Sequence, residues 1–301
     1  MPVDPQFDNI LAMFAAIPAV SEQPIEAIRS APTPINPAPT PVDSVTQQLI
    51  PGPAGDIDVR IYRAGGGANA PLLLFMHGGG FVVGGLDTHD EMARVLTAES
   101  GCVTVSVDYR LAPEHPFPAA PDDCFAALKW AAANAEALGA DSSRIAVAGD
   151  SAGGNLAAVT ALKARDEGGP ILRAQALLYP VTDPFAPLPP APDGKYYILT
   201  PKERDYYNAC YLPGAARASD PYASPAKAGS LKGLCPALVI TGEYDPLCAQ
   251  GEAYAARLRE AGVEADVSRY AGAIHGFMSF PAPMGRKGLQ EAAEWLKARL
   301  S

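Results

Sequence analysis

A serine stands between two glycines where an apolar run meets a segment of helix-forming residues. Residues 144–160 read RIAVAGDSAGGNLAAVT, which predicts a buried strand, a sharp turn at Ser151 and a helix. Gly149 and Gly153 lie two residues from Ser151, where strand and helix converge and only very small residues fit. Because the helix begins with free N–H groups, it would stabilise negative charge that develops beside the serine. The pattern predicts a serine nucleophile at the carboxyl edge of a sheet.

The chain has four histidines that could act as the base, which a weakly nucleophilic serine hydroxyl requires. His77 precedes three glycines, His89 lies in a polar stretch, and His115 lies among prolines. His275 follows the last expected strand on its carboxyl side, where the serine also points. We therefore expect His275 to take the proton of Ser151.

An acid that orients this histidine is expected after the strand at 237–241. The sequence there reads GEYDPL and offers Glu243 and Asp245. Asp245 is the first candidate, because Pro246 excludes an ordinary helical continuation and the position lies far enough beyond the strand to reach the next loop. Glu243, and Asp183 after the preceding strand, remain alternatives. With Asp245 the chain order is Ser, Asp, His, the order of the α/β-hydrolases.

Three glycines that follow His77 supply backbone N–H groups beside the expected site. They come directly after the strand expected at 72–76, and without side chains they allow a ligand to approach closely. We expect the N–H groups of Gly79, Gly80 and Ala152 to bind the tetrahedral oxyanion. Loss of one such donor costs about 3–4 kcal/mol in comparable enzymes.

Short apolar runs alternate with helical segments from residue 44 onward. This alternation predicts an α/β fold whose mostly parallel, eight-stranded sheet is covered by helices on both faces. A turn signal at 51–55 makes the first two strands an antiparallel hairpin. The expected strands are 45–50, 57–62, 72–76, 103–107, 145–148, 174–179, 237–241 and 265–270, and the expected helices include 119–135, 155–165, 249–261 and 286–300.

Two segments depart from the alternation. Apolar residues at helical spacing within 7–17, followed by Ile25 and Ile28, predict one or two short amphipathic helices, and five prolines within 31–41 predict an extended linker. The insertion 183–233 is too long to be a plain connection. We expect residues 1–43 and 183–233 to form a helical cap on a catalytic domain of residues 44–301.

Five of the insertion's tyrosines have two alternative roles. We expect most of them to pack the insertion's own core, and the alternative is that they line a lid over the site. They are Tyr196, Tyr197, Tyr206, Tyr207 and Tyr211.

Composition narrows the class of partner. Acidic residues outnumber basic ones by 33 to 23, and the net charge of -10 would repel nucleic acid and anionic membrane surfaces. Neither a dinucleotide-binding glycine motif nor a Walker lysine motif occurs. A neutral small molecule is the expected partner, and neither nucleic acid nor a membrane is expected.

Cysteines and the N-terminal residues indicate the compartment. The five cysteines are scattered and never spaced as C-x-x-C, which disfavours a disulfide framework and a zinc site, so no metal is expected. The apolar run at 10–20 follows Asp4 and Asp8, whereas a secretory signal begins with positive charge. We expect a cytoplasmic protein.

Six motifs together resemble one family. They are HGGGF at 77–81, DYRLAPEHPFPAA at 108–120, GDSAGGNLA at 149–157, YPVTD at 179–183, EYDPL at 243–247 and HGF at 275–277. This set resembles the bacterial hormone-sensitive-lipase family of esterases (family IV), in its GDSAG branch, over residues from about 44 to the end. The resemblance implies an α/β-hydrolase fold with a helical cap, and cofactor-free hydrolysis of carboxylic esters with short or medium acyl chains through an acyl-enzyme. It also implies frequent dimerisation, so a homodimer is expected.

The resemblance also assigns roles and reveals one departure. It gives the segment 108–120 a structural role under the oxyanion loop and makes Glu114 and His115 non-catalytic. The family usually has an arginine and then an acid after the DPL motif, where this chain has Cys248 and Ala249, so we expect a local charge network to be missing. Amide or lactone hydrolysis would use the same residues. A non-catalytic ligand-binding homologue is the alternative from another class.

Overall fold

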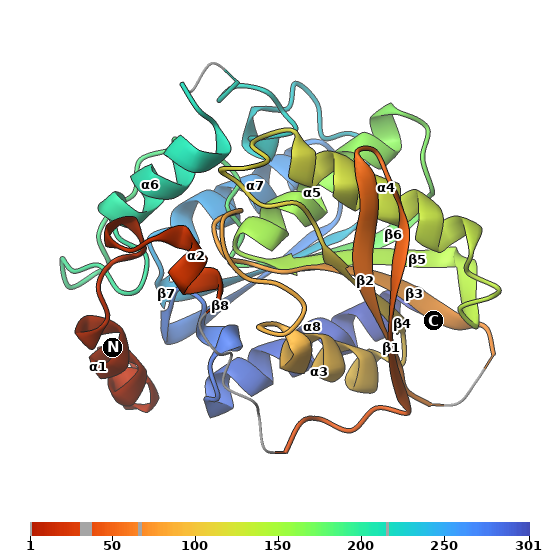
Figure 1. Ribbon diagram of the computed structural model, residues 1–301, viewed down its shortest axis with the longest axis horizontal. Coiled ribbons are helices and arrows are strands. Elements are labelled where there is room, and N and C mark those ends of the chain that lie inside the picture. The colour runs from red at the N-terminus through yellow and green to blue at the C-terminus, as the bar shows by residue number, and fades with distance from the viewer. Residues whose placement is uncertain (1, 31–37, 66–67, 215–216) are drawn as a thin grey trace.

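The computed structural model describes residues 2–30, 38–65, 68–214 and 217–301. Its centre is an eight-stranded sheet (Figure 1). In spatial order the strands are β1 (Ser44–Gly52), β2 (Gly55–Arg63), β4 (Val103–Asp108), β3 (Ala70–Met76), β5 (Ala140–Asp150), β6 (Leu172–Leu178), β7 (Ala237–Tyr244) and β8 (Ala265–Ile274). β1 with β2 and β2 with β4 pair antiparallel, and the other neighbours pair parallel. The prediction of eight strands in a mostly parallel sheet is confirmed.

Helices cover both faces of this sheet, as expected. The α-helices are α1 (Asp8–Ala16), α2 (Ile25–Arg29), α3 (Asp90–Ser100), α4 (Ala119–Ala133), α5 (Ala152–Asp166), α6 (Pro201–Tyr211), α7 (Cys248–Glu260) and α8 (Pro283–Leu300). Four short 3-10 helices, at Pro5–Phe7, Val20–Glu22, Pro225–Lys227 and Phe277–Ser279, complete the described elements. In Figure 1, α4, α5 and α7 lie on one side of the sheet, and α3 and α8 lie on the other.

The central strand β3 shows why its apolar run is continuous. Leu72, Leu74 and Met76 belong to the core cluster beneath α4 and α5, and the side chains that alternate with them, Leu73 and Phe75, belong to the cluster with α3 and α8. All five are buried. A strand that is covered on both faces has no solvated side, so polar residues do not alternate with apolar ones.

Two helices had no residue range in the sequence-based prediction. The start of α3 reads as a polar stretch, yet Met92, Val95 and Leu96 are buried against the sheet and α8. α6 lies inside the insertion, where Thr200 caps it by accepting the N–H of Glu203. Polar composition hid α3, because its apolar residues occupy only one stripe of the helix.

The expected N-terminal helices are present as α1 and α2, and the 3-10 helix between them, Val20–Glu22, contacts the insertion. The backbone N–H of Val20 donates to Glu203 of α6 at 3.0 Å, and Lys202 pairs with Glu22. Residues 31–37 of the expected linker lie outside the described residues. The N-terminal segment is thus joined to α6 by contacts between residues that lie far apart in the sequence.

The insertion's tyrosines divide between the two alternatives. Tyr196 donates to the carbonyl of Leu188, within the insertion, as expected. Tyr211 instead stacks on Phe81 of the oxyanion loop, with ring centroids 3.7 Å apart, so the expectation is wrong for this residue. It is also wrong for Tyr207, whose ring lies against the same loop.

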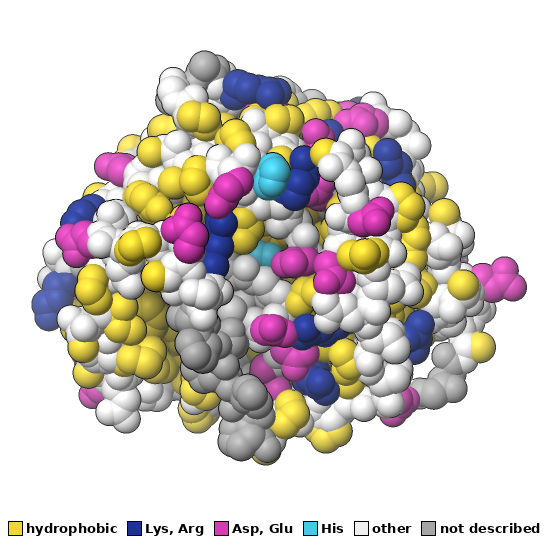
Figure 2. Space-filling model, viewed as in Figure 1, with side chains coloured by type: hydrophobic (Ala, Val, Ile, Leu, Met, Phe, Trp, Pro, Cys, Tyr) yellow, Lys and Arg dark blue, Asp and Glu magenta, His cyan; other side chains and the backbone are white. Residues whose placement is uncertain are grey.

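The surface mixes charge of both signs. On the face seen in Figure 2, basic and acidic side chains are interspersed, and hydrophobic side chains gather at the left, where Figure 1 places α1. Met13, Phe14 and Ile17 are large apolar residues exposed in or just after α1. None of the helices in the described ranges has both the length and the apolar character needed to cross a bilayer.

The connection from β5 to α5 brings three backbone segments into contact. A Cβ built on Gly149 would lie 2.2 Å from the carbonyl oxygen of Gly153, and one on Gly153 would lie 2.0 Å from that of Met76 in β3. Ser151, between the glycines, has φ 54° and ψ −114°, so the expected strained turn is confirmed. Glycine is required because backbone atoms cannot move aside as a flexible side chain can.

We predict that Gly153→Ala destabilises the protein by about 1–3 kcal/mol or more, because its Cβ would overlap the β3 backbone. Gly229→Ala is the matched control, since a Cβ there meets no atom within 4 Å. The free energies of unfolding in urea should separate the two variants. Equal values would show that the contact between β3 and α5 can relax.

Candidate active site

Three side chains from separate loops form a hydrogen-bonded row. The Oγ of Ser151 lies 2.9 Å from Nε2 of His275, and Nδ1 of His275 lies 2.8 Å from Oδ2 of Asp245. Asp245 and His275 are 4 % and 7 % exposed, and the other oxygen of Asp245 accepts the N–H of Leu247. If Nδ1–H donates to the carboxylate, Nε2 is left to accept the serine proton. The structure therefore brings together the three residues expected to act as nucleophile, base and orienting acid.

The two alternative acids are engaged elsewhere. Glu243 accepts the N–H of Gly272 at 2.8 Å. Asp183 accepts the N–H of Phe185 and pairs with Lys227 at 2.8 Å. Their partners lie outside the row, so the geometry favours Asp245 over both.

The oxyanion glycines have backbone conformations suited to their expected task. Gly79 and Gly80 have φ 119° and 61°, which glycine adopts without steric cost. In the described part of the chain, no acceptor is bonded to the N–H of Gly79, Gly80 or Ala152. Gly79, Gly80 and Ser151 also line one cavity. These N–H groups are thus available to a ligand.

Asp150 is a site residue that the sequence-based prediction missed. The N–H of Gly78 donates to its Oδ1 at 2.8 Å, and Nε2 of His89 lies 3.3 Å from the same oxygen. Burial alone would raise the pKa of Asp150, but His89 and the Gly78 N–H lower it below its usual value, so the carboxylate stays ionised. Its position directly before Ser151, at the carboxyl end of a strand, was the available signal.

The other histidines support the site or lie away from it. His77 is fully buried, and it stacks on Tyr109 with ring centroids 4.3 Å apart. Burial, together with the neighbouring His89, lowers the pKa of His77 to about 3. Its imidazole is therefore neutral under ordinary conditions. His115 is exposed, as suits a non-catalytic residue.

The segment 108–120 supports the oxyanion loop, as the resemblance implied. Tyr109 donates its hydroxyl to the carbonyl of His77 at 2.7 Å, and the N–H of Ala112 donates to the carbonyl of Phe81. Arg29 of α2 adds a contact that the sequence did not reveal. Its guanidinium donates to the carbonyls of Val82 and Ala112.

Arg29 also pairs with Glu114 at 2.8 Å. Glu114 therefore has a structural partner, in agreement with its expected non-catalytic role. The N-terminal helix, the oxyanion loop and the segment beneath it are joined at this one guanidinium.

Cys248, which stands where the family usually has an arginine, takes part in a different network at the start of α7. Glu252, four residues after Cys248, accepts the hydroxyl of Thr241 at 3.1 Å and pairs with Arg269. Cys248 donates its thiol to the same carboxylate. These bonds join β7, α7 and β8 one helical turn after Cys248, and Asp245 is not among the partners of Glu252 in them.

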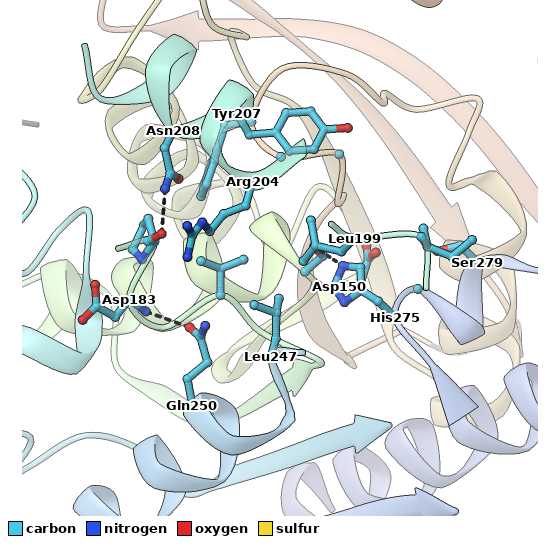
Figure 3. A pocket seen from close by; sticks show the side chains of 18 of the residues that line it. Asp150, Asp183, Leu199, Arg204, Tyr207, Asn208, Leu247, Gln250, His275 and Ser279 are labelled. Carbon is cyan, nitrogen blue, oxygen red and sulfur yellow. Dashed lines mark hydrogen bonds between the residues drawn. The ribbon is translucent and has the colours of Figure 1, made fainter. Parts of the chain in front are cut away.

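A cavity of about 220 Å³ opens beside Ser151. Its apolar lining includes Phe81, Val181, Leu199 and Leu247. Several lining residues come from the insertion, and Figure 3 shows Leu199 and Tyr207 among them. Across the described ranges, no group of three or more His, Cys, Asp or Glu residues could hold a metal ion. The five cysteines are all free.

Comparisons with known proteins find similar hydrolases. The sequence model of a family described as "alpha/beta hydrolase fold" matches residues 73–279. The chain is 45% identical over 267 residues to the carboxylic ester hydrolase LipN of Mycobacterium tuberculosis, covering 85% of this chain and 71% of that protein. It is 37% identical over 292 residues to an arylesterase of Saccharolobus solfataricus, covering 93% and 94% of the two chains.

A solved structure is similar over nearly the whole length. The hyperthermophilic esterase from the archaeon Pyrobaculum calidifontis superposes with a TM-score of 0.91 at 41% identity, covering 99% of each chain. Similarity over this extent includes the N-terminal segment and the insertion as well as the sheet.

The lowered pKa of His77 predicts an acid-sensitive contribution to stability. An unfolded histidine binds a proton below about pH 6.5, whereas the buried one resists it down to about pH 3. This contribution is therefore present above the unfolded pKa and is lost as the pH falls through that window, by up to about 1.4 kcal/mol per pH unit. In His77→Gln, urea unfolding should show a shallower decline between pH 6.5 and 4 than in the wild type.

Exposed His115→Gln serves as the control for that measurement. It should keep the wild-type slope. If His77→Gln also runs parallel to the wild type, His77 is already protonated in the folded protein.

Proposed function

The chain belongs to the hormone-sensitive-lipase family (family IV) of the α/β-hydrolase fold, in its GDSAG branch, and from this premise we propose that it is a serine carboxylesterase. Its substrates are carboxylic esters with short to medium acyl chains, cleaved through an acyl-enzyme. The observation that carries the proposal is the row from Ser151 through His275 to Asp245, set beside free backbone N–H groups.

Acylation begins at the serine oxygen. Nε2 of His275 takes the proton of Ser151 as Oγ attacks the ester carbonyl carbon, and Asp245 holds the imidazolium that forms. The carbonyl oxygen becomes an oxyanion, to which the N–H groups of Gly79, Gly80 and Ala152 donate. His275 then protonates the alkoxy oxygen as the C–O bond breaks, and the alcohol leaves.

Deacylation repeats these roles with water. His275 takes a proton from a water molecule, which attacks the acyl carbon on Ser151 Oγ. The same N–H groups hold the second oxyanion. Collapse of this intermediate returns the proton to Oγ and releases the carboxylic acid, so one water is consumed for each ester and no cofactor takes part.

The cap sets the size of the substrate. Residues 1–43 and 183–233 form it in this proposal, and the contact of Glu203 with Val20 supports their joint action. The insertion supplies Leu199 and Tyr207 to the cavity wall. The cavity volume of about 220 Å³ is below the roughly 300–1,000 Å³ of pockets for drug-sized ligands, which favours small esters.

Substitutions of Ser151 and Asp245 should lower kcat by different amounts. Ser151→Ala is expected to lower kcat on short aryl esters by about a million-fold, and Asp245→Asn by about ten-thousand-fold, because the latter disturbs the histidine tautomer. Steady-state kinetics and labelling of Ser151 by an organophosphate would measure this. Glu243→Gln, which keeps an acceptor for Gly272, should stay within about twofold of the wild type.

An inactive wild-type protein, or one whose Ser151 stays unlabelled, would refute the proposal. A larger loss in Glu243→Gln than in Asp245→Asn would instead reassign the acid to Glu243.

The oxyanion loop provides a second test. A Cβ on Gly80 would lie 2.5 Å from the Tyr207 ring, and φ is positive there, so Gly80→Ala must displace the loop. We expect kcat to fall by up to about a hundredfold. Gly85→Ala is the matched control, since its nearest neighbour, an oxygen of Asp108, lies 3.4 Å away. Similar kcat values in both variants would contradict a role for the Gly80 N–H.

A further inference from the structure

The cavity has two chemically different ends. Figure 3 shows His275 and Ser279 at one end and Asp183, Arg204 and Gln250 at the other, with Leu199 and Leu247 between them. All of these residues line the same cavity. The polar end is thus separated from the reacting atoms by apolar side chains, and the row of Ser151, His275 and Asp245 makes no use of it.

Gln250 presents N–H donors at this end. Its Oε1 accepts the backbone N–H groups of Thr182 and Asp183 at 2.8 and 3.0 Å, which fixes the orientation of the amide. Among the described residues, none accepts a hydrogen bond from Nε2 of Gln250. The Oε1 atom of Gln250 therefore holds the backbone at 182–183, and the NH₂ group makes no bond to it (Figure 3).

Arg204 of α6 provides further donors. Its Nε and Nη2 donate to Oδ1 of Asp205, and Nη1 donates to the carbonyl of Ala186. Other N–H groups of the guanidinium remain unused by these bonds, because each Nη carries two hydrogens. The side chain is 24% exposed and lines the cavity. Arg204 comes from the insertion, whereas Gln250 comes from α7, so two separate elements supply donors to one end.

The charges at this end are already paired. Asp205 neutralises Arg204, and Lys227 lies 2.8 Å from Asp183. A carboxylate placed here would have one arginine to attract it and the carboxylate of Asp183 in the same wall to repel it. An uncharged oxygen acceptor would use the donors without that repulsion.

The position of this end indicates which part of an ester would occupy it. In the proposed reaction His275 protonates the leaving alkoxy oxygen, so the alcohol lies on the histidine side. The polar end lies away from His275 (Figure 3). The acyl chain is therefore the part that extends toward Arg204 and Gln250.

We propose that Arg204 and Gln250 form a subsite for an uncharged oxygen acceptor, such as a keto or ether oxygen, carried on the acyl chain of the substrate. This inference rests on the proposed esterase function and narrows its substrate class to oxygenated acyl esters. Both residues are specificity-determining, and neither takes part in bond making or breaking.

The test compares ethyl esters of keto acids with their alkyl counterparts. The series pairs 3-oxobutanoate with butanoate, 4-oxopentanoate with pentanoate and 5-oxohexanoate with hexanoate, and kcat/KM is followed by titration of the acid released. For at least one chain length we expect the keto ester to be preferred by about tenfold, the value of one hydrogen bond from a charged donor. Monoethyl succinate, which ends in a carboxylate, should be a poorer substrate than ethyl 4-oxopentanoate.

Variants connect this preference to the two residues. Arg204→Met and Gln250→Glu should each reduce the keto-to-alkyl ratio toward one, and Gln250→Glu retains the oxygen that binds Thr182 and Asp183. Arg204→Lys, which keeps a donor and the charge, should retain part of the preference. Lys195→Met changes an exposed cation of the same insertion and should leave the ratio at the wild-type value.

The possible outcomes distinguish failure of the subsite proposal from failure of the proposed esterase function. Equal ratios in the wild type and in both variants, with alkyl esters still cleaved, would overturn the subsite and leave the esterase function intact. A preference for monoethyl succinate would overturn the uncharged acceptor. No cleavage of any ester by the wild type would refute the esterase function itself.

Discussion

The hydrogen bond from the N–H of Gly78 to the carboxylate of Asp150 is the contact on which the site depends. It joins the residue before the oxyanion glycines to the residue before Ser151. Both segments leave the carboxyl ends of neighbouring parallel strands, β3 and β5, so the sheet brings them close and this bond sets their spacing. A Cβ on Gly78 would lie 2.5 Å from the same carboxylate, so only glycine allows the approach. The buried carboxylate of Asp150 therefore sets the position of the oxyanion N–H groups relative to Ser151.

The presence of eight strands in a mostly parallel sheet and the positions of the candidate residues could be predicted because both follow from local patterns. Ser151 stands in a turn whose glycines are required by backbone contact, and His275 and Asp245 each follow a strand at the same edge of the sheet. Parallel strands bring such residues together whatever their separation in the sequence.

The parts that were missed depend on contacts between distant segments. Nothing in the residues near Arg29 indicates that its guanidinium binds the carbonyls of Val82 and Ala112. Tyr211 likewise has the same local sequence whether it packs within the insertion or stacks on Phe81. Periodicity reports which face of an element is buried, but it does not report what covers that face.

The hydrogen bonds of Arg29 couple changes in the N-terminal residues to changes in the oxyanion loop during evolution. A shortened relative that lacked α2 would keep the nucleophile, the base and the acid, yet two carbonyls of the loop and its support would lose their common donor. Gene truncation at this end would therefore select for compensating changes around Val82 and Ala112. The N-terminus and the oxyanion loop are expected to vary together among relatives, although some fifty residues separate Arg29 from Val82.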